Sequence, residues 1–306
     1  MRKGYPGYVE LYERRELKKR VDALYQRLAS CDLCPRNCRV DRLKGEKGFC
    51  RSGAFPIISS VSPHFGEEPE LVGRHGSGTI FLTNCNLLCI YCQNYDISHL
   101  GYGEEVSTEE LAKQMLHLQD IGCHNINLVT PTHFVPQIVQ AIYFAVEGGL
   151  NIPIIYNSGG YEKVETLRLL NGVVDIYMPD AKYSDPLVSK RYSKAEDYPL
   201  VMEDALREMY SQVGDLIIEQ GIARHGLLVR HLVLPNNLAG SSKIMEFIAS
   251  LSKNTYVNIM DQYRPMYKAS EYSELNRPIT ISEYREVIET AKQCGLYRGF
   301  SNVDLL

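Results

Sequence analysis

The sequence predicts an α/β protein whose parallel strands form an open or partial barrel. Between about residues 76 and 275, apolar runs that suit buried strands alternate with amphipathic helical stretches. This alternation is typical of parallel strands joined by right-handed helical crossovers. We count six such units, which are too few to close the eight-unit barrel.

The N-terminal part combines a helix with a cysteine-rich segment. Residues 8–30 have a helical period, and one apolar stripe runs along them through Leu17, Val21, Leu24 and Leu28. Residues 31–75 are punctuated by Gly and Pro, and we expect a small metal-stapled segment there rather than regular structure. Residues 1–75 are therefore interpreted as an N-terminal helix followed by a metal-binding segment.

Each strand of the expected barrel, residues 76–275, is a short apolar run. The expected strands cover 78–84, 126–130, 153–156, 174–179, 226–235 and 255–260. Helices are expected between them at 107–122, 135–147, 162–170, 199–221 and 241–252. Ser107 with Glu110 has the spacing of a capping box, and so has Thr280 with Glu283. The second pair begins a last helix that ends at Cys294, in a C-terminal segment (276–306) expected to pack on the barrel.

Composition excludes several functional classes. The formal net charge is −4, no long basic run is present, and no apolar run approaches the roughly 18 residues that a membrane span needs. The first residues contain no apolar core of a signal peptide. We therefore expect a soluble, cytoplasmic protein that binds neither nucleic acid nor a membrane.

The nine cysteines fall into two groups and two single positions. In a long chain without an export signal, such groups are typical of metal sites rather than disulfides. Cys123 and Cys294 stand alone, and we expect them to be small buried thiols. The other seven cysteines form a three-thiol group and a four-thiol group.

The three-thiol group directly follows the first expected strand. In FLTNCNLLCIYCQN, Cys85, Cys89 and Cys92 supply three thiols. Three thiolates on a 4Fe–4S cubane leave one iron without a protein ligand, and an open position distinguishes a reactive metal site from a closed one. The alternative is a zinc site completed by a distant histidine such as His99.

The spacing Cys-x3-Cys-x2-Cys, with the aromatic Tyr91 before the last cysteine, resembles the signature of radical S-adenosylmethionine (SAM) enzymes. The segments GSGTIFLTNCNLLCIYCQN, CDLCPRNC and MDQYRP resemble a branch of that family related to pyruvate formate-lyase-activating enzymes. This resemblance covers roughly residues 30–270. It implies a partial (β/α)6 barrel and a SAM molecule chelated at the free iron. It also implies reductive cleavage of SAM to a 5′-deoxyadenosyl radical, and an electron donor such as flavodoxin or ferredoxin.

The resemblance also suggests SAM contacts at the strand ends. The family's second strand usually ends in Gly-Gly-Glu, which meets the SAM amino group, but this chain has VTPTH. Thr130, Thr132 or His133 would have to replace that contact. The third strand ends in YNSGG, which places Asn157 and Ser158 where a polar SAM contact is expected. The glycines that follow them, 159 and 160, would let the backbone approach the ligand closely.

The later strands add charged candidates. Asp180 and Lys182 resemble the family's Asp-x-Lys pair, which lies near SAM and the substrate backbone. Arg230 is placed like the arginine that meets the SAM carboxylate, and a guanidinium fork suits a carboxylate. His231 should point to the opposite face of that strand and be satisfied in the core. The candidates for substrate contact after the sixth strand are Asp261, Gln262, Tyr263 and Arg264.

The four-thiol group consists of Cys31, Cys34, Cys38 and Cys50. Four thiolates complete either a tetrahedral zinc site or an auxiliary 4Fe–4S cluster, and the residues alone do not decide between these metals. The loop is also basic, through Arg36, Arg39, Arg42, Lys44 and Lys47. These charges would complement an acidic partner, solvate a surface, or offset the charge of the thiolates.

Three functional hypotheses follow. The first is a radical SAM enzyme that acts on a protein, for example as an activating enzyme that makes a glycyl radical. The second is a radical SAM enzyme that modifies a small metabolite. The third is an iron–sulfur or zinc interaction protein without SAM chemistry. A wide mouth of the barrel would favour a protein substrate, and a lidded one a small molecule.

Overall fold

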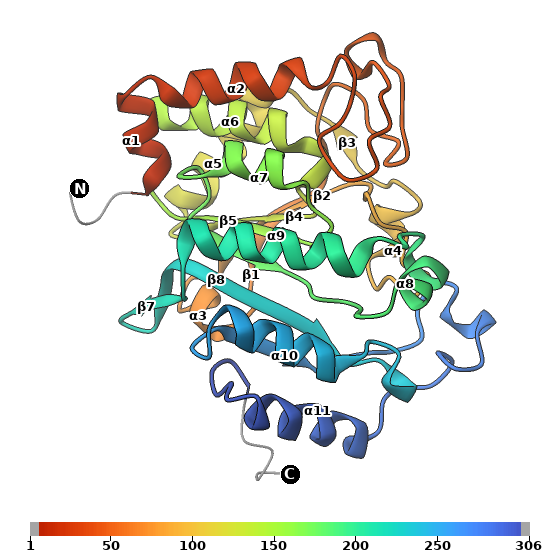
Figure 1. The fold of residues 1–306 in the computed structure, drawn as a ribbon. Coiled ribbons are helices and arrows are strands. Elements are labelled where there is room, and N and C mark those ends of the chain that lie inside the picture. The colour runs from red at the N-terminus through yellow and green to blue at the C-terminus, as the bar shows by residue number, and fades with distance from the viewer. Residues whose placement is uncertain (1–5, 301–306) are drawn as a thin grey trace.

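Six parallel strands run side by side through the computed structural model, which describes residues 6–300 (Figure 1). They are β2 (Ser77–Leu82), β4 (Ile126–Val129), β5 (Ile154–Ser158), β6 (Ile176–Pro179), β8 (Ile222–Leu232) and β9 (Tyr256–Met260). Neighbours pair in this order, and β9 pairs only with β8, so the sheet stays open. The prediction of a partial barrel with six units is confirmed.

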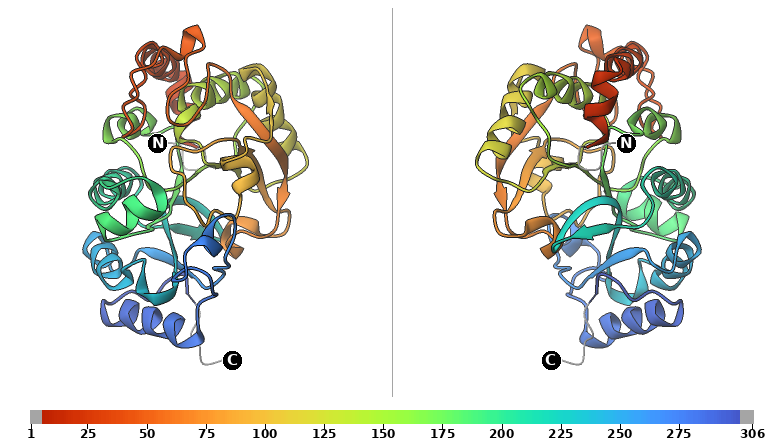
Figure 2. Two further views of the ribbon diagram at one scale, coloured as in Figure 1. Left: turned by 90° about the vertical axis from the view of Figure 1, so that its right-hand side faces the viewer. Right: turned by 90° about the vertical axis from the view of Figure 1, so that its left-hand side faces the viewer.

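Helices cover the outside of this sheet (Figure 2). They are α5 (Thr108–Asp120), α6 (Val135–Glu147), α7 (Val164–Leu170), α8 (Pro186–Ser193), α9 (Tyr198–Val213) and α10 (Ser241–Leu251). Every side chain of β4, β5 and β6 is buried, which explains their continuous apolar sequences. Ser107 accepts a hydrogen bond from the Glu110 amide at the start of α5, as its spacing predicts.

The helices α2 (Glu16–Gln26) and α11 (Ile281–Gln293) lie at opposite ends of the molecule (Figure 1). At the first end, α1 (Gly7–Glu13) and α2 replace the single helix expected over 8–30, because Arg15 breaks it with a φ of 59°. The predicted stripe of α2 is buried against α6. At the other end, α11 has the predicted capping box and packs against α10.

The segment between residues 31 and 75 is more regular than expected. It contains β1 (Ile57–His64) and α3 (Pro69–Val72), so the prediction of an irregular segment is wrong for its second half. β1 pairs antiparallel with β2 and with the short β3 (Glu104–Glu105). Its polar, half-exposed sequence contains no continuous apolar run, as is common for a strand near a sheet edge.

The helix expected over 199–221 is shorter than predicted. Gly214, at a φ of 65°, ends α9, and β7 (Ile217–Glu219) then forms an antiparallel hairpin with β8. Short connecting helices complete the described chain. They are α4 (Tyr95–Ser98), η1 (Arg42–Lys44), η2 (Thr132–Phe134), η3 (Pro235–Asn237) and η4 (Ala269–Glu271).

Within residues 6–300, no helix has both the length and the apolar character to cross a membrane. Residues 1–5 of the expected N-terminal segment and 301–306 of the expected C-terminal segment lie outside the described residues. The division into segments at residues 75 and 275 stays a prediction.

A buried carboxyl group joins α1 to the sheet and should make stability depend on pH. Asp175 accepts hydrogen bonds from the amides of Gly7 and Ile154, at 3.2 and 2.9 Å. Burial raises the pKa of Asp175 to about 7, although these two bonds lower it. The folded protein therefore holds this proton more tightly than the unfolded chain, whose Asp pKa is about 3.9. The stability that the proton contributes is lost as pH rises from about 4 towards 7.

We predict that Asp175→Asn flattens this dependence. For one proton the slope is about 1.4 kcal/mol per pH unit, which anaerobic denaturant unfolding between these pH values would detect. Asp120→Asn, at an exposed position at the end of α5, is the matched control and should leave the slope unchanged. Equal slopes for the parent and Asp175→Asn would contradict the prediction.

Candidate active site at the carboxyl ends of the strands

A cavity of about 240 Å³ opens at the carboxyl ends of the parallel strands. Each of the six strands, or the loop that follows it, contributes to its wall. Examples are Cys89 after β2, Thr130 after β4, Ser158 on β5, Asp180 after β6, Arg230 on β8 and Gln262 after β9. In α/β folds this edge is where ligands bind, because loops of free sequence converge there on a rigid sheet. The cavity is therefore the candidate active site.

All three thiols of the loop after β2 line this cavity, and each sulfur has a hydrogen-bonding partner. The Leu87 amide donates to Cys85 Sγ at 3.3 Å, and the Ser193 hydroxyl donates to Cys89 Sγ at 2.9 Å. Cys92 Sγ lies 3.1 Å from the hydroxyl of Ser98. Donors aimed at sulfur favour the thiolate form, which is the form that binds a metal.

The electrostatic setting of these thiols fits a metal centre. Burial raises the pKa of Cys85 and Cys92, and the neighbouring Cys89 raises both further, whereas the charge of Lys182 lowers them. Cys85 and Cys92 therefore hold their protons more tightly than free thiols do, and metal binding releases protons. Binding of a metal by this loop therefore depends on pH, because the buried thiols must first give up their protons.

A zinc site at the three thiols would need His99 as its fourth ligand. Among the described residues, no three His, Cys, Asp or Glu side chains gather closely enough to hold one metal ion. A cubane takes each thiolate at a different iron, so its ligands stand apart around the cluster. His99, the expected fourth ligand of a zinc site, has its Nε2 2.9 Å from the carbonyl of Cys89 and stacks on Tyr267.

Charged side chains in the wall of the cavity pair with one another, and Arg230 also pairs with Glu67, which does not line the cavity. Lys182 Nζ donates to Asp180 Oδ2 at 2.6 Å, and Arg230 Nε donates to Asp180 Oδ1 at 3.0 Å. Arg230 also donates to the Asn157 side chain at 2.7 Å and lies 3.5 Å from Glu67. Burial raises the pKa of Asp180, but Arg230 and Lys182 overcome this and hold it below its usual value. The carboxylate of Asp180 is thus ionised.

Glu67 is a partner of the site residue Arg230 that sequence analysis missed. It lies in the loop between β1 and α3, and its carboxylate faces Arg230. The expectation that Arg230 needs an anionic partner in an apolar strand is met by Asp180 and Glu67 together. The acidic stretch GEEPE was the one sequence signal for an anionic partner of Arg230. Nothing in that stretch indicates which strand it faces.

Of the three candidates to replace the Gly-Gly-Glu contact, only Thr130 lines the cavity. Its φ is 60°, a region that β-branched residues rarely adopt, and its amide donates to the carbonyl of Asn157 at 2.8 Å. Thr132 is fully buried and gives its hydroxyl to Glu162 at 2.6 Å. Thr132 is therefore not part of this site. His133 lies in a different cavity, described below.

The ends of β5 and β6 approach each other closely. Asn157, Ser158 and Gly159 line the cavity. Gly160 does not, but its φ is 74°, and a Cβ atom there would lie 2.2 Å from the carbonyl oxygen of Asp180. Gly160 is thus required because any side chain there would collide with the backbone of the neighbouring strand. Gly159, which lines the cavity, leaves its backbone accessible to a ligand.

The rim of the cavity follows β9. Gln262, Tyr263 and Arg264 line it, whereas Asp261 is exposed and does not, so Asp261 is not part of the cavity. Tyr263 is buried and makes an edge contact with Tyr91, with ring centroids 5.8 Å apart. These two rings form an apolar part of the wall beside the thiols.

His231 points away from the cavity, as the two-residue period of β8 predicts. Its Nδ1 lies 2.7 Å from the carbonyl of Ala181, and its Nε2 lies 2.8 Å from the hydroxyl of Ser241. Both ring nitrogens are satisfied in the core. Cys123 is buried as expected and Cys294 is half-buried, and neither lines the two cavities described.

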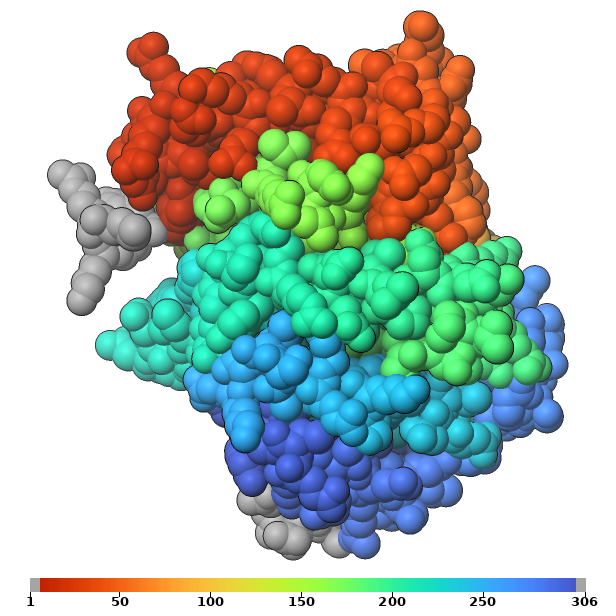
Figure 3. Space-filling model, viewed as in Figure 1, coloured from red at the N-terminus to blue at the C-terminus, as the bar shows by residue number. Residues whose placement is uncertain are grey.

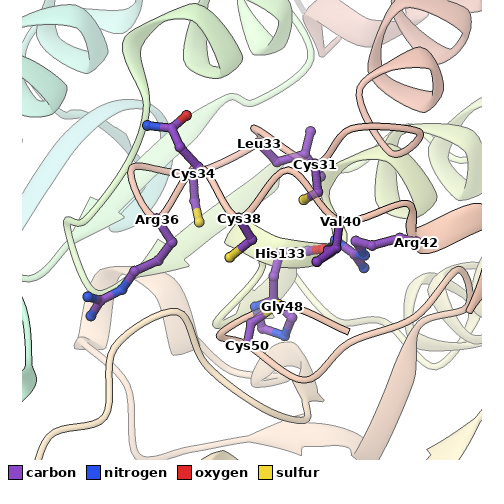
Figure 4. A pocket seen from close by; sticks show the side chains of 11 residues that line it. Cys31, Leu33, Cys34, Arg36, Cys38, Val40, Arg42, Gly48, Cys50 and His133 are labelled. Atoms are coloured by element: carbon purple, nitrogen blue, oxygen red, sulfur yellow. Dashed lines mark hydrogen bonds between the residues drawn. The ribbon is translucent and has the colours of Figure 1, made fainter. Parts of the chain in front are cut away.

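The four-thiol group lines a second, smaller cavity (Figure 4). Cys31, Cys34 and Cys50 are buried and Cys38 is half-buried, and none forms a disulfide. The segment that carries them is the orange-red end of the molecule in Figure 3. All four thiols are thus free to bind a metal.

The wall of this second cavity includes Arg42, which the sequence grouped with surface charges. Arg42 is only 1% exposed, and its guanidinium donates twice to the Gly53 carbonyl, at 3.0 and 2.6 Å, and once to the His133 carbonyl at 2.6 Å. No acidic side chain among residues 6–300 forms an ion pair with it. A buried cation is costly without compensating negative charge, which metal-bound thiolates would supply.

His133 is a second residue of this wall that the sequence did not assign to it. Its Nε2 lies 2.8 Å from the carbonyl of Thr83, so that nitrogen carries the proton and donates. The other ring nitrogen, Nδ1, is buried and has no partner among the described residues. A histidine held through one nitrogen by a carbonyl, with a free lone pair on the other, is typical of a metal environment.

Comparison with known proteins gives a consistent result. The model of the radical SAM superfamily matches residues 79–239. An uncharacterised protein of Methanocaldococcus jannaschii, MJ0674, is 34% identical over 277 residues, which cover 87% of this chain and 75% of that protein. A second from the same organism, MJ0808, is 24% identical over 163 residues and is matched over 46% of its length.

Among solved structures, the chain is similar to HydG, a maturase of the [FeFe]-hydrogenase. The TM-score is 0.50 at 14% identity, over 72% of this chain. This chain spans only half the length of the HydG chain. At this identity the likeness extends to the fold alone.

We predict that Thr130→Gly stabilises the protein. Glycine adopts this φ without the steric cost, so the free energy of unfolding should rise by about 1 kcal/mol after the greater freedom of the unfolded chain is subtracted. Anaerobic denaturant titration would measure it. Thr108→Gly, in the first turn of α5, is the control and should lose stability, since glycine disfavours a helix. A loss of stability in Thr130→Gly as well would show that the threonine side chain outweighs the strain.

Proposed function

The chain belongs to the radical SAM superfamily, and from this premise we propose that it is an enzyme that cleaves SAM reductively and removes hydrogen from a protein substrate. The observation that carries the proposal is the three-thiol loop in the wall of a cavity to which all six parallel strands contribute. An interaction protein with iron or zinc but no SAM chemistry would not need this converging set of charged and polar groups.

In this proposal Cys85, Cys89 and Cys92 hold a 4Fe–4S cluster and leave one iron open for SAM. When bound, the cluster and SAM supply a 5′-deoxyadenosyl radical that abstracts hydrogen from the substrate. The protein orients and shields these groups. The edge contact of Tyr91 with Tyr263 beside the thiols supports the exclusion of water from the reaction.

The binding of SAM is proposed to use the balanced charges of the wall. Arg230 would meet the carboxylate, and Asp180 with Lys182 would lie near the amino acid part of SAM. Asn157, Ser158 and the hydroxyl of Thr130 offer polar contacts, since all three residues line the cavity. The carboxylate of SAM would then be a further anionic partner of Arg230, while Asp180 stays paired with Lys182, so no buried charge is left unpaired.

A protein substrate is favoured by the rim of the cavity. Gln262, Arg264 and Met266 line it and are also exposed, so the cavity opens to the surface beside β9. An open mouth admits a loop of a partner protein, and we propose an activating-enzyme-like role in which a glycyl radical is made on that partner. A small metabolite is the competing substrate, and substrate screening with the reduced enzyme separates the two.

The reaction needs a one-electron donor, and we propose flavodoxin or ferredoxin. An oxygen-sensitive cluster held by free thiols is maintained in a reducing compartment, so the cytoplasm is the proposed location.

The four-thiol group is proposed to hold a second metal centre, either zinc or an auxiliary 4Fe–4S cluster. The buried, unbalanced charge of Arg42 and the free Nδ1 of His133 support a metal there. Four thiolates suit either metal, and metal analysis of the purified protein separates zinc from iron.

We predict that the anaerobically reconstituted protein cleaves SAM to 5′-deoxyadenosine and methionine when a strong one-electron reductant is added. Replacing Cys85, Cys89 and Cys92 together by Ala should abolish cleavage and remove about four irons per chain, as expected for one cubane. Cys123→Ala is the matched control and should change neither value. Unchanged iron and sulfide in the triple variant would contradict the assignment, and intact iron without SAM cleavage in the parent would favour the interaction protein.

We also predict that Arg230→Ala weakens SAM binding by about 10- to 100-fold, the equivalent of about 1.5–3 kcal/mol for a charged hydrogen bond. Isothermal titration under anaerobic conditions measures this. Arg224→Ala replaces an exposed arginine of the same strand and should leave the affinity unchanged. If both variants bind SAM like the parent, Arg230 only neutralises Asp180 and Glu67.

A further inference from the structure

Arg36 joins the four-thiol segment to the three-thiol loop. It lies between Cys34 and Cys38 in the sequence, but its guanidinium points to other parts of the chain. Nε donates to the carbonyl of Asn86 at 2.9 Å, Nη1 to that of Lys194 at 2.5 Å, and Nη2 to that of Ser193 at 3.4 Å. Three hydrogen bonds from one side chain thus hold two distant backbone segments.

Both of these segments reach the three-thiol loop. Asn86 directly follows Cys85, and its side-chain amide donates to the carbonyl of Tyr161 at 2.7 Å. Ser193 donates its hydroxyl to Cys89 Sγ at 2.9 Å. Arg36 therefore fixes the backbone on either side of the sulfurs without touching a sulfur itself.

The position of the guanidinium depends on the closed form of the four-thiol segment. Its central carbon lies 3.8 Å from the ring centroid of Phe49 and 5.0 Å from that of Tyr161. Phe49 precedes Cys50, and its amide donates to Cys38 Sγ at 3.3 Å. A metal that closes these thiols thus orders both the backbone around Arg36 and the ring on which it stacks.

Two further contacts join the same parts of the chain. The Arg42 guanidinium donates a hydrogen bond to the carbonyl of His133. The His133 ring donates one to the carbonyl of Thr83, two residues before Cys85. The side-chain amide of Asn84 donates to the hydroxyl of Ser52 at 3.2 Å, beside Cys50. The two thiol groups therefore belong to one hydrogen-bonded unit.

We propose that Arg36 is a positioning residue for the three-thiol site, through which a metal centre at the four thiols sets the hydrogen bonding of Cys89 and the reduction potential of the cluster. The inference rests on the proposed function, since it needs a cluster at Cys85, Cys89 and Cys92. Hydrogen bonds to the sulfurs stabilise the more negative, reduced cluster, so their loss lowers the potential.

The first test compares Arg36→Met with Arg39→Met in the reconstituted full chain. Arg39 belongs to the same loop, but its side chain is 60% exposed and forms an ion pair with Asp32 on the surface. Arg36→Met should keep a cluster that responds to SAM in electron paramagnetic resonance, with a more negative midpoint potential and SAM affinity weakened about tenfold. Arg36→Lys should lie between, because lysine keeps the charge but lacks the fork. Arg39→Met should behave like the parent.

The second test empties the four-thiol centre. Cys31→Ser with Cys34→Ser should lose one zinc or about four irons per chain and shift the potential in the same direction. Adding Arg36→Met to this variant should then cause no further shift, because both changes remove the same contact. Additive shifts would overturn the inference, since Arg36 would then act independently of the centre.

Ser193→Ala gives a test that does not disturb the four-thiol segment. It removes the hydroxyl donor to Cys89 and should lower the potential even when the four-thiol centre keeps its metal. A SAM-responsive cluster whose potential and SAM affinity are the same in Arg36→Met and in the parent overturns the inference alone. A parent protein without any SAM-responsive cluster contradicts the proposed function, and the inference fails with it.

Discussion

Parallel pairing of the strands is the constraint on which the rest of the structure depends. Because β2, β4, β5, β6 and β8 pair in one direction, with β9 beside β8, their carboxyl ends meet at a single edge. The backbone of each strand is satisfied by its neighbours, so the residues just beyond the strands are free to carry chemistry. Cys85, Cys89 and Cys92 thereby line the same cavity as Arg230 and Gln262.

Charge balance is the second condition that this wall must meet. Arg230 and Lys182 face Asp180 and Glu67, and each cation lies within 4 Å of a carboxylate. An unpaired member of this set would cost several kcal/mol in the interior. The balanced set holds the side chains in fixed positions before any ligand arrives, which is the preorganisation that binding and catalysis both require.

The N-terminal segment is part of the same unit rather than an appendage. The side chains of Arg36 and Arg42 hydrogen-bond to the carbonyls of Asn86 and His133, and the ring of His133 hydrogen-bonds to the carbonyl of Thr83 before the thiol loop. Within the four-thiol part of this segment, residues 31–50, Leu33 is the buried apolar side chain besides the cysteines. The order of this part therefore depends on these polar contacts and on the closure of its thiols, which is why the two thiol groups are expected to influence each other.

The sequence by itself determined the features that depend on neighbours along the chain. Apolar runs identified all six parallel strands, and the spacing of Thr280 and Glu283 identified a capping box that the structure contains. The spacing of Cys85, Cys89 and Cys92 indicated a cluster with one open iron. Residues that share one face of a helix or strand recur at a fixed spacing along the chain. A single sequence therefore shows which residues share a face.

Only the tertiary structure decided which distant residues meet. Ser193 reaches Cys89 across 104 positions, and Arg42 reaches His133 across 91. Glu67, in the loop after β1, faces Arg230 on β8, and Thr132 turns towards Glu162 rather than the cavity. A residue's type and spacing show which face of its element it occupies, but the group opposite that face is set by how the elements pack.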